Sequence, residues 1–333
     1  MSRTLPLKAA ALAVSALLAL TACGSSDPDD ASADSTAFSF TDDLGTKIEL
    51  DAVPERLLVQ SSMAAALTDL GLGDKIVGTF GPLKNAEGEP DSQVAGLDIE
   101  SVVDVTGGGE YGDVDTEKAV GLKPDLIITS QYLAPDLWYL NEASATDLTK
   151  LAPILVVDFD GKTLPELLDA TERAAKALGA DLDSADVTAS HTAFTAAADR
   201  VKQASADLGD RTVLAGSGAV DLFYASNPNV SPDLSYWKDE LGLPITVPDD
   251  PDEGGYFESL SWEKADKYPA DIFLYDDRVG AAGLQQLETE KVFQTLEAAK
   301  NKAYVPWTSV APPSYQSYAD LMNRLADDLG AFV

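Results

Sequence analysis

DTEKAVGLKPDLII, residues 115–128, is the segment that decides the fold of this chain. Its first part, residues 116–122, predicts a short helix. The part that follows, residues 124–129, contains a continuous apolar run of the kind that lies buried in parallel sheets. A helix that leads into such a strand indicates an α/β layer, in which strands and helices alternate along the chain.

The residues on either side of this segment follow the same alternation. Apolar and polar residues alternate around the turn residues 43–45, which predicts a β-hairpin. A helix is predicted after the next strand, with Ser61 and Ser62 as its cap and Gly71 at its end. The predicted hairpin strands are residues 38–40 and 47–50, the further strands 56–60, 75–80 and 154–159, and the helices 61–70 and 135–151.

Two longer helices interrupt this pattern in the middle of the chain. They are predicted at residues 164–178 and 184–208, and the second is rich in alanine and free of glycine and proline. A helix of about 25 residues reaches about 37 Å, which is enough to connect two lobes. The α/β pattern then restarts, with strands at 212–215, 272–275 and 303–305, and helices at 233–241, 262–268, 292–298 and 315–329.

The sequence therefore predicts an α/β fold of two α/β lobes with central, mostly parallel sheets, joined by one long rigid helix. The predicted boundaries are residues 38–182 for the N-terminal lobe, 183–208 for the connecting helix and 209–333 for the C-terminal lobe. Ligands of open α/β sheets bind beyond the carboxyl ends of the strands, so we expect a ligand cleft between the lobes.

The first 37 residues indicate export. Arg3 and Lys8 precede an apolar run at residues 9–20, which is too short to span a bilayer and is typical of a secretory signal. The ending Leu-Thr-Ala-Cys resembles the signal of bacterial lipoproteins, which implies a signal peptide at residues 1–22 and lipidation of Cys23; an ordinary secretory signal is the alternative. Residues 23–37 are rich in Ser, Asp and Ala and predict a flexible tether. We therefore expect an exported protein, anchored by lipid to the outer face of the cytoplasmic membrane.

Composition excludes several classes of function. The 333 residues include 56 acidic and 23 basic side chains, and the resulting net charge of −33 would repel nucleic acid. One cysteine and one histidine exclude a disulfide framework, a Cys-rich metal cluster and a multi-histidine metal centre. The histidine, His191, lies inside the long predicted helix. No Gly-x-Ser-x-Gly motif surrounds Ser217, and we expect no enzyme activity.

Four regions, in order along the chain, resemble the siderophore, haem and cobalamin class of periplasmic-type substrate-binding proteins, which feed ATP-driven (ABC) importers. They are DDLGTKIEL at 42–50 with VPER at 53–56, the segment at 115–128, SLSWE at 259–263 with PADI at 269–272, and VFQTLEAAKNKAYV at 292–305. The resemblance implies capture of a ferric siderophore or similar bulky metal chelate and its delivery to a permease dimer with ATPase subunits. It also implies that one acidic residue of each lobe, here Glu117 and Glu263, docks with arginines of the permease. We expect the protein to act as a monomer and without a cofactor of its own.

Residues near the ends of the predicted strands are the candidate ligand contacts, because these ends face the cleft. Many are aromatic, which suits a bulky ligand with apolar and oxygen-rich surface. The candidates are Ser62, Met63, Phe80, Tyr111, Gln131 and Tyr132 in the first lobe, and Ser217, Tyr224, Tyr256, Trp262, Arg278 and Trp307 in the second.

Arg278 gives the most specific indication of the ligand. Its guanidinium offers five donors in a planar fork, which suits hydroxamate, catecholate or carboxylate oxygens around ferric iron. A salt bridge to Asp276 or Asp277 is the alternative role. A single basic group would serve a trianionic chelate poorly, so the sequence favours a neutral or cationic chelate such as a ferric trihydroxamate.

Other ligands and another role remain open. Haem could be bound through an axial phenolate of Tyr111, Tyr132, Tyr224 or Tyr256. Cobalamin could be carried by the same route. A lipoprotein of this fold could also act as a sensor that does not transport its ligand.

Overall fold

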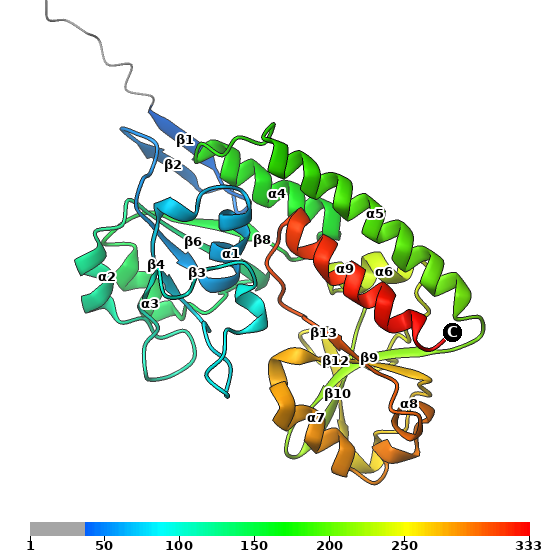
Figure 1. Cartoon of the computed structure of the whole chain (residues 1–333). Coiled ribbons are helices and arrows are strands. Elements are labelled where there is room, and N and C mark those ends of the chain that lie inside the picture. Colours follow the sequence, from blue (N-terminus) through cyan, green and yellow to red (C-terminus); the bar gives the residue numbers. More distant parts are fainter. Residues whose placement is uncertain (1–36) are drawn as a thin grey trace, which may run out of the picture. The chain divides into compact units, whose positions relative to one another are not determined.

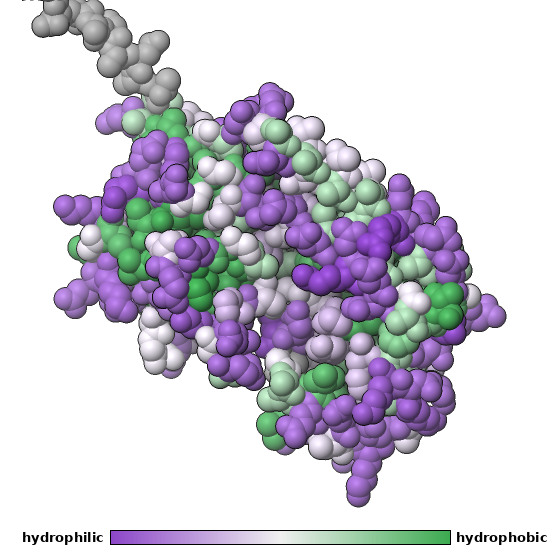
Figure 2. Space-filling model, in the orientation of Figure 1, coloured by the Kyte–Doolittle hydropathy of each residue, from purple (hydrophilic) through white to green (hydrophobic). Residues whose placement is uncertain are grey.

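The computed structural model describes residues 37–333, which form two lobes connected by long helices (Figure 1). The predicted signal peptide, Cys23 and all of the predicted tether except Ala37 lie outside the described residues. None of the helices between residues 37 and 333 combines the length and the apolar content needed to cross a bilayer. Hydrophilic side chains cover much of the face drawn in Figure 2, in keeping with the high charge of the chain.

The N-terminal lobe contains the strands β3 (Leu57–Gln60), β4 (Ile76–Phe80), β5 (Val103–Asp104), β6 (Leu126–Leu133), β7 (Asp136–Leu137) and β8 (Ile154–Asp158). They form one sheet in the order β5-β4-β3-β6-β7, with β8 also paired to β6. All pairs are parallel except β6 with β7. The central strands β3 and β6 are buried over most of their length, which explains the continuous apolar run in the sequence. The predicted hairpin is confirmed as β1 (Phe38–Thr41) and β2 (Lys47–Leu50).

Three helices belong to this lobe: α1 (Ser61–Asp69), α2 (Thr116–Leu122) and α3 (Glu142–Leu148), with the 3₁₀ turns η1 (Gly73–Lys75) and η2 (Ser92–Val94). The prediction of one helix over residues 135–151 is wrong. β7 folds back on β6, and the Trp138 N–H donates to the Ser130 carbonyl (2.8 Å), so the sheet uses these backbone groups. The helix begins only after Asn141, whose side chain accepts the Ser144 N–H (2.9 Å).

Long helices connect the lobes. The chain passes through α4 (Leu164–Ala177) and α5 (Ala185–Asp207), and α9 (Tyr315–Gly330) packs along α5 (Figure 1). α5 is the long helix that the sequence predicts. α4 packs into both hydrophobic cores, since Leu167 lies in the N-terminal core and Leu168 in the C-terminal core. Close-packed cores resist deformation, so this shared helix limits movement of one lobe against the other.

The C-terminal lobe contains the strands β9 (Val213–Gly218), β10 (Leu222–Ser226), β11 (Phe257–Ser261), β12 (Ile272–Asp276) and β13 (Tyr304–Trp307), in the order β11-β10-β9-β12-β13. The pairs β9–β12 and β12–β13 are parallel, whereas β10 is antiparallel to both of its neighbours. The helices are α6 (Pro232–Asp239), α7 (Gly280–Thr289) and α8 (Glu297–Lys300), with the 3₁₀ turns η3 (Trp262–Lys264), η4 (Asp277–Val279) and η5 (Phe293–Thr295). The predicted α/β fold of two lobes joined by a long helix is confirmed, although this second sheet is mixed.

Three predicted elements of this lobe differ in extent. β9 continues to Gly218, whereas the sequence predicts that this strand ends at Ala215. A Cβ atom on Gly216 would come within 2.4 Å of the Tyr224 carbonyl oxygen, so the close pairing with β10 depends on glycine. The helix predicted at residues 262–268 is only the turn η3, and the one predicted at 292–298 is divided into η5 and α8 because the backbone is extended at Leu296.

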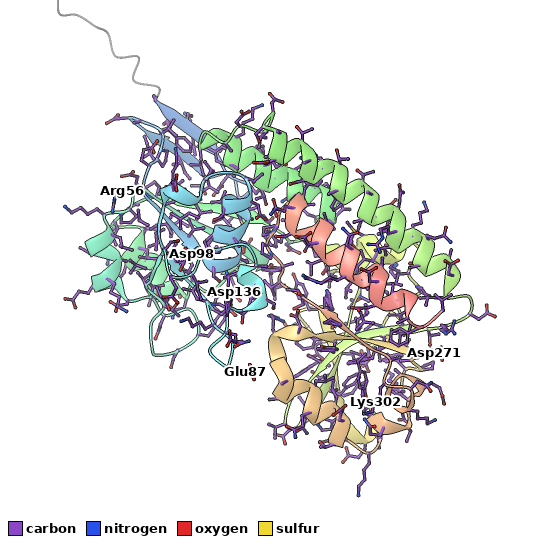
Figure 3. All side chains as sticks on the ribbon, viewed as in Figure 1. Arg56, Glu87, Asp98, Asp136, Asp271 and Lys302 are labelled. Atoms are coloured by element: carbon purple, nitrogen blue, oxygen red, sulfur yellow. The ribbon has the colours of Figure 1, made fainter. Side chains whose placement is uncertain are left out.

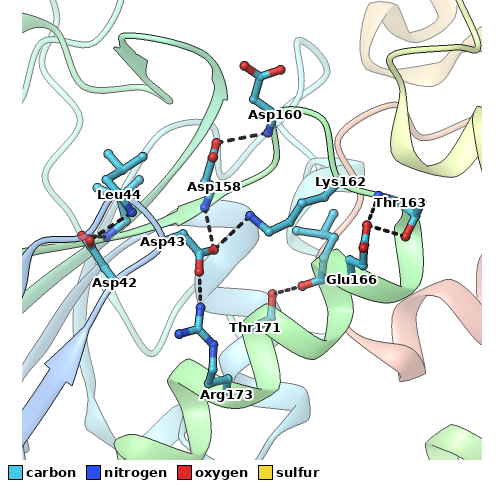
Figure 4. A network of polar contacts seen from close by, with 12 residues as sticks. Asp42, Asp43, Leu44, Asp158, Asp160, Lys162, Thr163, Glu166, Thr171 and Arg173 are labelled. Carbon is cyan, nitrogen blue, oxygen red and sulfur yellow. Dashed lines mark hydrogen bonds and ion pairs between the residues drawn. The ribbon is translucent and has the colours of Figure 1, made fainter.

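A polar network fixes the first hairpin to the end of β8 (Figure 4). The Asp43 side chain is 8% exposed and pairs with Arg173 of α4 and with Lys162 (3.3 Å). It also accepts the Asp158 N–H (3.1 Å). Two cations and a backbone donor satisfy this carboxylate in spite of its burial. The network holds the loop after β8, where Phe159 lies.

Candidate ligand-binding site

A cavity of about 500 Å³ lies between the two lobes, a size typical of small-molecule sites. The lining residues of the first lobe form what we call the N-terminal wall; they are Tyr111, Tyr132, Leu133, Asp136, Leu137, Trp138 and Phe159. The lining residues of the second lobe form the C-terminal wall; they are Ser217, Tyr224, Ser226, Ser231, Pro232, Asp233, Tyr256, Phe257, Asp276, Arg278, Trp307, Ser309 and Val310. The connecting helices α4 and α9 add Leu167 and Tyr318.

Most of the candidate ligand contacts from the sequence meet at this cavity. Those that line it are Tyr111, Tyr132, Ser217, Tyr224, Tyr256, Arg278 and Trp307. Those that do not line it are Ser62, Met63, Phe80, Gln131 and Trp262. The structure therefore brings together candidates from both lobes and leaves the others elsewhere.

Ser62 and Met63 lie in the first turn of α1, where both are fully buried, as is Phe80 at the end of β4. The Gln60 side-chain oxygen accepts the N–H groups of Ser62 (3.1 Å) and Met63 (3.2 Å). Gln60 therefore caps α1, and the predicted cap formed by Ser61 and Ser62 is wrong. Because this turn is enclosed and its donors are used within the protein, it does not reach the cavity.

The other two candidates are also occupied within the protein. Gln131 lies inside β6 and is 4% exposed. The Trp262 indole donates to the carbonyl oxygen of Ala219 (3.1 Å), and its ring lies against Gly218. Residues next to a strand end thus reach the cavity only where no core element covers them.

Aromatic rings in tilted and edge-to-face contact form most of the N-terminal wall. The ring centroid of Tyr132 lies 4.6 Å from that of Trp138 and 4.5 Å from that of Phe159, and Tyr111 lies 6.2 Å from Trp138. The buried Trp138 Nε1 has no hydrogen-bond partner among residues 37–333. This wall therefore offers broad aromatic surface to a ligand.

Three tyrosine hydroxyls of the cavity, those of Tyr111, Tyr132 and Tyr256, are donors at neutral pH. Burial raises the pKa of Tyr111 and of Tyr256 to about 12, and burial raises the pKa of Tyr132 well above its ordinary value. Each hydroxyl thus keeps its proton. The Tyr256 hydroxyl donates a hydrogen bond to the backbone carbonyl of Tyr132 and so links the two walls.

Arg278 is the basic group of the C-terminal wall, and it forms the salt bridge that the sequence left as an alternative. Its Nε and Nη2 donate to the two carboxylate oxygens of Asp276, at 3.1 Å and 2.7 Å. Burial alone lowers the pKa of Arg278, but the hydrogen bonds and charge of Asp276 outweigh it and the pKa is raised. The side chain is 32% exposed, and Asp276 uses two of its five N–H donors. The others remain for a ligand.

Sequence reasoning missed Trp138 and Asp233. Trp138 falls within a predicted helix, and only the pairing of β7 with β6 turns it toward the cavity. Asp233 follows a Ser-Pro pair at the start of α6, where an acidic residue is ordinarily exposed. Instead it is 2% exposed and accepts the Trp307 indole N–H (2.7 Å). A helix start followed by apolar residues could have suggested burial, but not contact with Trp307.

The two candidate docking residues lie outside the cavity. Glu117 is exposed in the first turn of α2, and Glu263 is exposed in η3. Hydrogen bonds from its own N–H and from the Ser261 hydroxyl lower the pKa of Glu263. One exposed glutamate is thus available on each lobe.

The described residues offer no cluster for a bare metal ion. Within residues 37–333, no three His, Cys, Asp or Glu side chains are grouped to hold one. His191 instead contacts Glu172 (Nε2 to Oε1, 2.6 Å) and stacks on Tyr315, with ring centroids 3.9 Å apart. It therefore has a packing role between α4, α5 and α9.

Comparison with known proteins gives a consistent picture. The periplasmic binding protein family matches residues 58–311. The structure of DesE, a ferric-siderophore receptor protein from Streptomyces coelicolor, is 36% identical, covers 88% of this chain and 97% of its own, and has a TM-score of 0.80. Two others share the fold: the petrobactin-binding protein YclQ from Bacillus subtilis (18% identical, 88% and 98% covered, TM-score 0.65) and FhuD2 from Staphylococcus aureus with bound ferrioxamine B (19%, 83% and 98%, 0.57). No curated protein sequence matches the chain.

Proposed function

Because this chain belongs to the periplasmic binding protein family, we propose that it captures a ferric siderophore of the hydroxamate type and delivers it to an ABC permease. The family consists of substrate-binding proteins of importers, not of enzymes. The observation that carries the proposal is the cavity between the lobes, which joins an aromatic wall to a single arginine. Its support from outside the chain is the 36% identity to a ferric-siderophore receptor.

The chemistry of the cavity suits a bulky chelate. Aromatic rings can pack on the hydrocarbon links between the iron-binding groups of a siderophore. The free N–H groups of Arg278 can donate to the oxygens that surround the iron. The aromatic rings and Arg278 lie on opposite walls, so a chelate that contacts both is oriented as well as enclosed.

The charge of the cavity favours a hydroxamate over a catecholate chelate. Arg278 is the one basic side chain among the described lining residues, and Asp276 already pairs with it. Asp136 and Asp233 add negative charge to the same lining. A ferric tris-catecholate carries three negative charges and would be repelled, whereas a ferric trihydroxamate core is neutral.

Fluorescence titration tests the ligand class. Trp138 and Trp307 line the cavity and Trp237 and Trp262 do not, so ligand in the cavity should quench part of the tryptophan emission. We expect saturable quenching by ferrioxamine-type chelates and none by ferric catecholates at the same concentration. The Trp262→Phe variant should keep the quenching. Tight binding of the catecholates without binding of the ferrioxamine type would contradict the proposal.

Haem and cobalamin are the other ligands that the same fold could carry. Haem would use an axial phenolate, and the raised pKa values of Tyr111, Tyr132 and Tyr256 oppose loss of that proton. An absorbance spectrum of the protein purified from iron-limited cells distinguishes the three cargoes. We expect the broad visible band of a ferric hydroxamate and not the sharp bands of haem or the corrin bands of cobalamin.

We also propose that the protein acts as a lipid-anchored monomer beside its permease. Lipidation of Cys23 would hold it on the outer face of the cytoplasmic membrane, and Glu117 and Glu263 would dock with arginines of the permease dimer, whose ATPase subunits drive import. A Cys23→Ser variant should leave the membrane fraction while retaining its affinity for the chelate. If the protein were instead a sensor, it would bind the chelate but would not support its uptake into cells.

A further inference from the structure

Asp233 lies at the start of α6 and lines the cavity, although only 2% of the residue is exposed. Its Oδ2 accepts the Trp307 indole N–H (2.7 Å), and its Oδ1 accepts the Ser231 hydroxyl (2.9 Å) and the Leu234 N–H (2.8 Å). All three donors are uncharged. A carboxylate has about four acceptor sites, so one of them remains free.

This carboxylate has no counter-ion in the part of the chain that the structure describes. It takes part in none of the ion pairs formed by residues 37–333. Three other carboxylates are about as buried, with side chains that are 8% exposed, and each of them forms an ion pair with a lysine or an arginine. They are Asp43, Glu258 and Asp276. Asp42 and Asp91 are buried without a cation, but they hold turn N–H groups and do not line the cavity. Burial raises the pKa of Asp233 in spite of its hydrogen bonds, as expected for a charge without balance.

The rest of the cavity does not supply the missing positive charge. Arg278 is the one basic side chain of the described lining and is paired with Asp276. Asp136 adds an exposed carboxylate, on the side of the N-terminal lobe that faces the other lobe (Figure 3). An enclosed site with excess negative charge attracts cations and binds them more strongly than an open surface does.

We infer that Asp233 binds a cationic group of the ligand, such as a primary ammonium, and that the cavity therefore selects chelates with a net positive charge. The inference rests on the proposed function, because it places this group on a ferric chelate. An ammonium has three donors and no acceptor, so it can fill the free acceptor site of Asp233 and balance its charge in one contact. Trp307 and Ser231 would hold the carboxylate in place for that contact.

A pair of probes that differ only in this group tests the inference. Ferrioxamine B ends in a primary ammonium, and its N-acetyl derivative has the same neutral ferric trihydroxamate core without the charge. By tryptophan fluorescence we expect ferrioxamine B to bind the wild-type protein at least tenfold more tightly than the acetylated chelate. In the Asp233→Asn variant the ratio should fall to about one, because the amide oxygen can still accept from Trp307 but carries no charge.

Asp69→Asn is the matched control. Asp69 also accepts hydroxyl hydrogen bonds, from Ser314 (2.5 Å) and Ser317 (2.9 Å), and burial raises its pKa, but it lies outside the cavity. This variant should keep the wild-type ratio. Two outcomes would overturn the inference without affecting the proposed function. One is equal affinity of the two probes for the wild-type protein, and the other is a tenfold ratio that persists in Asp233→Asn. If neither chelate bound the wild-type protein, the proposed function would fall and the inference with it.

Discussion

The two walls of the cavity differ in what they offer a ligand. The N-terminal wall is mainly aromatic and apolar, and its one charged residue, Asp136, is exposed. The C-terminal wall contains Arg278 with Asp276, the buried Asp233 and four serines. The first wall therefore provides contact area with little directional preference, and the second provides charge and hydrogen bonds that fix orientation.

The difference follows from the two sheets. In the N-terminal lobe the hairpin of β6 and β7 extends beyond the parallel strands and places Tyr132 and Trp138 side by side. In the C-terminal lobe the parallel strands β12 and β13 end at Asp276 and Trp307, where short turns bring polar groups to the cavity. A division of labour between the walls means that variants on each should alter different properties of binding.

The largest effect is expected where the lobes are alike, at the proposed docking residues. The double variant Glu117→Ala, Glu263→Ala should lower cellular uptake of the chelate to background, because the steering and register of both lobes on the permease would be lost. Affinity for the chelate in solution should stay within about twofold of the wild-type value. Transport of radiolabelled iron and fluorescence titration measure the two properties.

The chain contains a matched control for this experiment. Glu142 and Glu297 are also exposed glutamates in the first turn of a helix, one in each lobe. Their double alanine variant has the same net charge as the docking variant and should retain uptake. Uptake that survives loss of Glu117 and Glu263, or that is lost equally in the control, would show that the docking assignment is wrong.

The next largest effect is expected on the C-terminal wall. Arg278→Ala should weaken binding of a ferric trihydroxamate by about 10- to 100-fold, since it removes charge-assisted donors and leaves Asp276 without its counter-ion. Arg278→Lys should recover only part of this loss, because an ammonium cannot donate as a planar fork. Fluorescence titration of the three proteins measures the series. Full affinity in the alanine variant would remove Arg278 from the site.

A smaller effect is expected on the N-terminal wall. Trp138→Phe keeps an aromatic ring but reduces its contact area at the cavity, so affinity should fall by about two- to tenfold. Trp237 is a suitable control, because it is a buried tryptophan that does not line the cavity. Trp237→Phe should leave affinity unchanged. Since each variant removes one fluorophore, calorimetry is the better measurement here.

The sequence predicts those parts of the fold that depend on local pattern. The helix at 116–122 and the strand after it are confirmed, because a buried parallel strand is apolar whatever its neighbours are. Arg56 ties them to β3 by donating to the Leu122 carbonyl from Nε (3.0 Å) and Nη2 (2.6 Å), and it is labelled in Figure 3. β7, β10 and β11 were not predicted from the sequence. β7 has only two residues, and β11 is defined by its pairing with β10, which lies far away in the sequence.

The same limit applies to the candidate site. Position after a strand was enough to select Tyr132 and Arg278, which line the cavity. It also selected Ser62, because the sequence does not show that Gln60 and the core enclose the start of α1. The position of Asp233 at the cavity depends on the packing of α6 against β13, because its partner Trp307 lies 74 positions away in the sequence. Sequence pattern therefore identifies strand ends, and tertiary packing decides which of them stay open.

The smallest effect is expected on stability, and it compares a carboxylate between the lobes with one inside a lobe. Asp277 accepts the Ser92 hydroxyl of the other lobe (2.8 Å), and burial raises its pKa above the ordinary 3.8. Within the C-terminal lobe, burial alone would raise the pKa of Glu258, but the hydrogen bonds from Lys267 and Tyr268 outweigh it, and the pKa lies below the ordinary 4.5. The two groups should therefore respond to pH in opposite directions.

A raised pKa in the folded state gives stability at low pH that is lost as pH rises through that pKa, and a lowered pKa gives stability that is lost as pH falls through it. From about pH 4 to about pH 7, the free energy of unfolding of the wild-type protein relative to Asp277→Asn should fall, by less than about 1 kcal/mol. Relative to Glu258→Gln it should rise as pH increases through the range below 4.5. The negative charges of Asp276 and Asp91 face Asp277 and raise its pKa further, so they strengthen the fall in stability relative to Asp277→Asn. Urea denaturation at several pH values measures both slopes, and slopes of the same sign would mean that the contact between the lobes is no different in kind from one within a lobe.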